Sequence, residues 1–217
     1  VKPLQLKIGM IMNQPRNKIV GQIVNQNSQV FIIGVFTIDQ ILKFTKYTER
    51  LIVSYDDDEK PIYNKQVQRE VESSRVERIA DFLINDPLAS FPTNIVLGIP
   101  RVSINEQNVL KLNNDVNTNF LEITLKENVF EEIKKENGDV FITIIDGQHR
   151  ICGIEIAINR LQIDIDTLIR TIRYSDSSEL QKKLKRAQKR LDDLKKIELA
   201  VSFFIDPSLE YQAMIFS

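Results

Sequence analysis

The segment 140–161 constrains the fold more than any other part of the sequence. Residues 140–145 form the most β-prone apolar run of the chain, and a tight turn at Asp146-Gly147 follows it directly. Apolar residues then recur at helical spacing, at Ile151, Ile154, Ile158 and Leu161. The pattern predicts a buried strand that passes directly into a helix.

The turn itself reads Asp146-Gly147-Gln148-His149-Arg150. The first amides of a helix lack partners and attract anions, and a glycine lets a phosphate approach the backbone. Arg150 offers a planar fork of donors, His149 can donate or carry a proton, and Asp146 could hold magnesium. The alternative is structural: Asp146 only caps the helix, and His149 and Arg150 lie on a solvated first turn.

The composition of the 217-residue chain is ordinary for a globular protein, with a formal net charge of −1. A single cysteine and a single histidine exclude a disulfide within the chain and the usual zinc sites, so we expect no bound metal of that kind. No apolar run is long enough for a membrane helix, and a cytoplasmic location is expected. The start at Val1 and the apolar end at Ser217 suggest a trimmed chain that lacks part of its C-terminus.

The remaining elements follow from periodicity and from breakers. The pattern predicts a β-rich part over residues 1–60 and a mixed core over 60–217. Strands are expected at 4–11, 19–24, 30–36, 94–99 and 120–125, with a helix over 76–84 that Ser73 or Ser74 caps. Residues 101–118 read as a surface loop, and 129–133 as a short helix.

A strongly basic stretch runs from Gln181 to Lys196, with eight Lys or Arg against two Asp. A short heptad seam, with spacings of four, three, four and three, runs through it from the preceding leucine: Leu180, Leu184, Ala187, Leu191 and Leu194. We expect this helix to pack on an earlier one, such as 164–173. Phosphate contact is a second role, with these candidate DNA-binding residues: Lys182, Lys183, Lys185, Arg186, Lys189 and Arg190.

The five-residue turn resembles the signature of the DGQHR-domain family, which includes DndB-type regulators of DNA phosphorothioate modification. An upstream block agrees with the family in order and spacing: Gln68-Arg69, Ser74-Arg75-Val76, Ile79-Ala80 and Phe91-Pro92. Downstream, residues 199–204 and 211–216 resemble its closing strand and helix. The resemblance covers about residues 60–217.

This family is similar to ParB and sulfiredoxin, which implies an α/β (α+β) fold with a mixed sheet and flanking helices. To this core the basic helix and its expected partner add a projecting helical pair near 164–197. The resemblance implies that Gly147, Gln148, His149 and Arg150 surround the phosphates of ATP or CTP, with Arg69 and Arg75 as further candidates. Gln148 stands where sulfiredoxin has its reactive cysteine, so reductase chemistry is not expected.

Three functional hypotheses follow. The first is a nucleotide-binding regulator of a DNA-modification or defence system, bacterial or phage, with NTP hydrolysis as a possible activity. In it Asp146 and His149 are the catalytic candidates, Mg²⁺ is a possible cofactor, and DNA and a second copy of the chain are possible partners. The second is a non-enzymatic DNA-binding transcriptional regulator. The third is a metal-dependent nuclease of the ParB-like kind.

Overall fold

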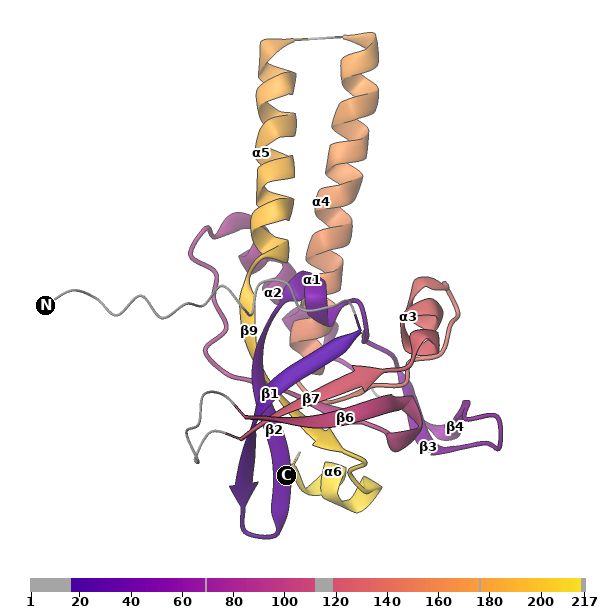
Figure 1. Cartoon of the computed structure of the whole chain (residues 1–217). Helices are drawn as coiled ribbons and strands as arrows, with labels where there is room; N and C mark the ends of the chain where they lie inside the picture. Colours follow the sequence, from indigo (N-terminus) through magenta and orange to yellow (C-terminus); the bar gives the residue numbers. More distant parts are fainter. Residues whose placement is uncertain (1–16, 69, 112–118, 176, 216–217) are drawn as a thin grey trace, which may run out of the picture.

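The computed structural model describes residues 17–68, 70–111, 119–175 and 177–215. The mixed α/β class that the sequence predicted is confirmed (Figure 1). The strands are β1 (Lys18–Gln26), β2 (Gln29–Thr37), β3 (Arg50–Tyr55), β4 (Pro61–Gln68), β5 (Ile95–Ile99), β6 (Ile104–Lys111), β7 (Asn119–Leu125), β8 (Thr143–Asp146) and β9 (Glu198–Ile205). The helices are α1 (Ile38–Ile41), α2 (Ser73–Asn85), the 3₁₀ turn η2 (Arg101–Ser103), α3 (Glu127–Lys134), α4 (Gln148–Tyr174), α5 (Ser178–Lys195) and α6 (Leu209–Ile215).

In the described residues, seven strands form one sheet in the order β6-β7-β1-β2-β9-β5-β8, and β3 pairs with β4 in a separate ribbon. All neighbours in the large sheet are antiparallel except β5 and β9, which run parallel. Strands of the N-terminal segment and of the later core therefore share one sheet. The carboxyl ends of β5 and β9 lie side by side at one end of the strands. The turn after β8 lies at the opposite end, because β8 runs antiparallel to β5.

Helices α2 and α4 pack closely against each other. A side chain at Gly153 of α4 would place its Cβ 2.5 Å from Cγ2 of Ile79 and 3.1 Å from the Val76 carbonyl oxygen on α2. Only a glycine at this position lets the two helices approach so closely. Arg160 of α4 extends the contact by pairing with Glu77 and Asp81 of α2.

The main hydrophobic core joins the sheet to these helices. Burial of large aliphatic and aromatic side chains supplies most of the driving force for such a fold. The largest fully buried members are Phe36, Phe203, Ile19, Ile32, Ile38, Ile41, Leu83, Ile95, Leu97, Ile99, Ile123 and Leu125. Among the helices of the described ranges, none combines the length and the apolar character that crossing a membrane requires.

Helices α4 and α5 form a hairpin whose far part projects from the body (Figure 1). The projecting pair that the sequence predicted is present, but its first helix is longer than expected. The patterns at 147–161 and 164–173 predicted two separate helices, and they form one uninterrupted helix of 27 residues. Residues 162–164 contain no proline or glycine that would end it.

Three other expectations about secondary structure were wrong. Residues 104–111 of the expected loop form β6, because an exposed edge strand can carry polar side chains on both faces. Residues 140–142 are buried but precede β8, which starts at Thr143. No serine caps α2: its N-cap residue is Glu72, without a side-chain capping bond. The strand expected at 4–11 lies outside the described residues.

Candidate functional site

The turn between β8 and α4 depends on a left-handed glycine. Gly147 has φ 98° and ψ 16° and is the N-cap residue of α4. A Cβ at this position would lie 3.2 Å from both Cγ1 of Ile95 and Nη2 of Arg150, in a backbone conformation that side chains disfavour. The strand–turn–helix predicted from the sequence is thus confirmed, and Gly147 is the residue that makes it possible.

The first turn of α4 is open at its N-terminus. The Gly147 carbonyl oxygen accepts from the Ile151 amide at 2.9 Å, and no side chain caps the helix. Within the described ranges, no acceptor is found for the amides of Gln148, His149 and Arg150. The alternative in which Asp146 caps the helix is wrong: the N-cap residue is Gly147, and the Asp146 carboxylate accepts from Arg150. These amides and the helix dipole leave a positive electrostatic end at the turn.

Arg150 ties the turn to the segment that enters β5. Its Nη1 donates to the carbonyl oxygen of Thr93 at 2.7 Å and to the Thr93 hydroxyl at 2.8 Å, and its Nη2 lies 3.3 Å from Oδ2 of Asp146. The side chain is 15% exposed. Burial lowers the pKa of the Arg150 guanidinium, and the nearby Arg75 lowers it further, whereas the charge of Asp146 opposes this shift. The guanidinium is therefore largely engaged in holding the turn in place.

His149 connects the start of α4 to the start of α2. Its Nε2 accepts from the backbone amide of Glu72 at 3.1 Å, which requires an unprotonated Nε2. Burial lowers the pKa of His149, and the positive charge of Arg75 adds to this effect, whereas Glu72 and Asp146 oppose it. The imidazole is accordingly neutral near pH 7, with Nδ1 as its remaining donor.

The other predicted site residues, Gln148 and Arg75, lie in different places around the turn. The side chain of Gln148 donates to the Ile144 carbonyl oxygen at 3.4 Å and lines a small cavity together with Lys46 and Arg50. Arg75, at the start of α2, is exposed and lies close enough to affect the pKa of both His149 and Arg150. Arg69 lies outside the described residues.

The geometry supports a catalytic role of Asp146 and His149, or a metal site at Asp146, less than it supports anion binding by the amides of the turn. The carboxylate of Asp146 is 54% exposed and faces Arg150, while the Nε2 of His149 is turned to Glu72. In the part of the chain that the structure describes, no three His, Cys, Asp or Glu side chains form a group that could hold a metal ion. The turn therefore presents backbone donors beside the exposed Arg75 of α2, and the described residues do not assemble an acid–base or metal centre there.

The predicted DNA-binding cations of α5 fall into three groups. Lys182, Lys185 and Arg186 are exposed and have no acidic partner among the described residues. Lys183 pairs with Glu179 at 2.9 Å, and Lys189 pairs with Asp193 one turn further along. Arg190 differs from all of these. Its guanidinium donates to carbonyl oxygens at the C-terminal end of α2, those of Leu83, Ile84 and Asp86.

Sequence reasoning missed the contribution of α4 to the far end of the hairpin. Arg170 and Arg173 are exposed there, and the side chain of Tyr174, the last residue of α4, is 92% exposed. These residues would have been found if 164–173 had been recognised as a continuation of the helix that starts after Gly147. The tip of the hairpin thus carries cations from both helices and an aromatic ring.

Comparison with known proteins identifies a family. The family DndB, described as DNA-sulfur modification-associated, matches residues 20–217. Neither a search of curated proteins nor a search of solved structures gives a match to this chain. The more detailed likeness to ParB and sulfiredoxin stays a prediction. Because the match extends over most of the sequence, the chain belongs to the DndB family of DNA-sulfur modification-associated proteins.

Proposed function

We propose that the protein is a regulator associated with DNA-sulfur modification that contacts DNA through the α4–α5 hairpin. The observation that carries this proposal is the group of three exposed cations, Lys182, Lys185 and Arg186, on a hairpin that projects from the body (Figure 1). Lys185 and Arg186 follow Lys182 by three and four residues, which places all three on one side of α5. The opposite side packs on α4 and the body through Leu191 and Leu194.

The chemistry of this surface suits phosphate rather than base edges. Lysine and arginine side chains contact the DNA backbone without reading sequence, and each neutralised phosphate releases counterions. The resulting affinity falls steeply with salt. The exposed ring of Tyr174, at the tip of the same hairpin, adds one group that can stack on a base or pack on a sugar. Sequence-specific recognition is not part of this proposal.

The test compares two triple variants by fluorescence polarisation with a labelled DNA duplex. Changing Lys182, Lys185 and Arg186 to Ala should weaken binding by about 100-fold at low salt and reduce the salt slope by about 3. The matched control changes Lys43, Lys60 and Lys134, three exposed lysines of the body, and should have a small effect. Equal effects of the two variants, or none from the hairpin variant, would reject the hairpin as the DNA contact.

A second candidate function is binding of a nucleotide phosphate at the 146–150 turn. The uncapped amides of Gln148, His149 and Arg150, beside the exposed Arg75, favour an anion there. Because Arg150 is already bonded to Thr93, it would shape the site while the amides and Arg75 hold the phosphate. ATP and CTP remain the proposed ligands, with Mg²⁺ near the exposed Asp146 carboxylate. NTP hydrolysis, assisted by His149, belongs to this second candidate.

Calorimetry with ATP, CTP and GTP in the presence of magnesium tests this second candidate. We expect one nucleotide to bind and Arg75→Ala to weaken it by about tenfold, the usual loss of one charged phosphate contact. Arg78→Ala, one turn further along α2 and paired with Glu72, is the matched control. The candidate is rejected if the folded protein binds none of the three nucleotides. Release of inorganic phosphate, measured on the same samples, tests hydrolysis separately.

A further inference from the structure

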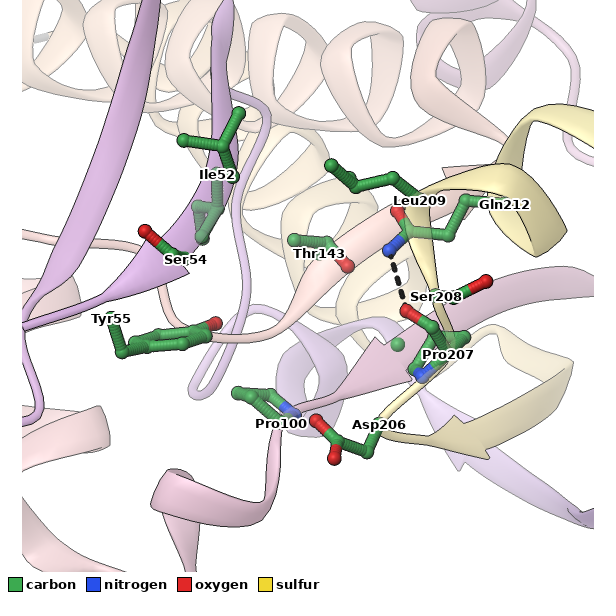
Figure 2. A pocket seen from close by; sticks show the side chains of 12 residues that line it. Ile52, Ser54, Tyr55, Pro100, Thr143, Asp206, Pro207, Ser208, Leu209 and Gln212 are labelled. Carbon is green, nitrogen blue, oxygen red and sulfur yellow. Dashed lines mark hydrogen bonds between the residues drawn. The ribbon is translucent and has the colours of Figure 1, made fainter.

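A cavity of about 380 Å³ lies at the carboxyl ends of the parallel strands β5 and β9 (Figure 2). Its volume is within the usual range for a small-molecule site. The chain leaves β5 at Pro100 and β9 at Asp206, and the Asp206 amide donates to the Ile99 carbonyl oxygen at 2.8 Å. Neither the hairpin nor the 146–150 turn contributes to the lining, so this cavity is separate from both sites described above.

The lining combines a flat aromatic side chain with aliphatic groups. Tyr55 of β3 donates its hydroxyl to the Phe141 carbonyl oxygen at 3.3 Å, and its ring lies nearly parallel to that of Phe141, at 9°. These contacts fix the orientation of the Tyr55 ring, which Figure 2 shows extending toward Thr143. Burial raises the pKa of Tyr55, so its hydroxyl stays neutral. The aliphatic part of the lining comes from Ile52, Pro100, Pro207 and Leu209.

The polar groups of the cavity are acceptors and neutral donors. Among the described residues that line the cavity, Asp206 carries the single formal charge, and none is Lys, Arg or His. Its backbone is left-handed, with φ 54°, and its carboxylate lies 3.6 Å from Nε of Arg101, outside the lining. Thr143 and Ser208 add hydroxyl groups. A phosphate would meet the Asp206 carboxylate here, and the neighbouring cation, Arg101, is already paired with that carboxylate, so an anionic ligand is disfavoured.

We propose that this cavity binds an amino-bearing nucleobase, as a free nucleoside or as a base within a single strand. A planar ring can pack against Tyr55 and the prolines, which suits an aromatic heterocycle. The Asp206 carboxylate accepts from an exocyclic amino group, as acidic side chains do from cytosine in DNA recognition. The Thr143 hydroxyl can pair with a neighbouring ring atom.

Binding of cytidine and guanosine to the full chain, followed by isothermal titration calorimetry, tests the proposal. Uridine, which lacks an exocyclic amino group, is the matched ligand and should bind about tenfold more weakly, the loss expected for one hydrogen bond to a charged acceptor. The 5′-monophosphates should bind more weakly than the nucleosides. Stronger binding of the monophosphates, or no binding of either nucleoside by the folded protein, overturns the proposal.

Two variants locate the binding in the cavity. Asp206→Asn removes the charge, and asparagine tolerates the left-handed backbone. Ser54→Tyr fills the cavity from β3, where an aromatic residue suits a strand and the serine is exposed. Each should weaken cytidine or guanosine binding at least about tenfold. Asp57→Asn, on the exposed loop between β3 and β4, is the control and should leave binding unchanged.

Circular dichroism melting verifies that each variant is folded, and binding that survives both Asp206→Asn and Ser54→Tyr refutes the proposal. A short single-stranded oligonucleotide then distinguishes the two sources of the base. Displacement of bound nucleoside by the oligonucleotide, sensitive to Asp206→Asn, supports a base within a strand. Nucleoside binding without such displacement supports a free nucleoside. Both of these outcomes place the base in the cavity.

Discussion

Both ends of α4 carry arginines, but the one at the start is mostly buried and hydrogen-bonded, whereas those at the far end are exposed. At its start, Arg150 and His149 are bonded to the Thr93 segment and to Glu72, and the guanidinium is mostly buried. At its far end, Arg170 and Arg173 are exposed. The same contrast holds along α5 between Arg190, bonded to α2 carbonyls, and Arg186, which has no acidic partner among the described residues. A cationic motif in a sequence is therefore informative about ligands only once its internal partners are known.

The largest expected effect is on the stability of the base of α4. Arg150→Met should lower the free energy of unfolding by about 3 kcal/mol, because the hydrogen bonds to Thr93 and Asp146 are lost in a mostly buried place. Urea unfolding measures this change. Arg186→Met is the matched control at the exposed end and should leave stability unchanged. If the two variants lose equal stability, the contrast between the two ends of the helix is wrong.

A partly buried carboxyl in the first half of α4, that of Glu155, should make stability depend on pH. Burial raises the pKa of Glu155 to about 7, although its carboxylate accepts from the Tyr47 amide. The folded protein therefore binds this proton more tightly than the unfolded chain, and this contribution to stability is lost as pH rises from about 4.5 to about 7.

Glu155→Gln should accordingly raise the free energy of unfolding by about 2 kcal/mol at pH 8 and give no gain at pH 4. Denaturant unfolding across this pH range measures it. Glu131→Gln, on the exposed side of α3, should leave the pH profile unchanged. Parallel profiles of Glu155→Gln and the wild type would show that burial does not raise this pKa.

A smaller effect is expected at the left-handed glycine. Gly147→Ala should cost about 1–2 kcal/mol, because alanine disfavours φ 98° and its Cβ would press on Ile95. Thermal unfolding detects the loss. Gln188→Ala, on the exposed side of α5, introduces the same residue in a helical position and should be neutral. A neutral Gly147→Ala would mean that the turn adopts another conformation.

The smallest effect is expected at the tip. Tyr174→Ala should leave stability unchanged, because the side chain is 92% exposed. If the hairpin contacts DNA as proposed, DNA affinity should fall by about threefold with the salt slope unchanged, since no charge is removed. Polarisation titrations at two salt concentrations measure both quantities, and Tyr174→Phe should retain the affinity. A changed slope would indicate that the hairpin itself had moved.

Local patterns predicted the strand–turn–helix around Gly147, the strands β5 and β7 and the helical hairpin, because each has a strong apolar period. They failed for β6, which is polar and is fixed by pairing with β7. Arg150 and Arg190 could not be interpreted from spacing, since their partners at Thr93 and Leu83 are distant in the sequence. The cavity beside Asp206 could not be predicted either, because the parallel pairing of β5 with β9 brings together lining residues that are far apart in the sequence.

The continuity of α4 has a mechanical consequence. A helix of 27 residues is about 40 Å long, so a tilt of roughly five degrees at its start would displace its far end by about 3.5 Å. Together with α5, it sets the distance between the body and the tip of the hairpin. Adding one turn to each helix would extend the arm by about 5.4 Å without altering the sheet. Lengthening or shortening the hairpin is thus a way to change how far from the body the tip makes contact while the base stays intact.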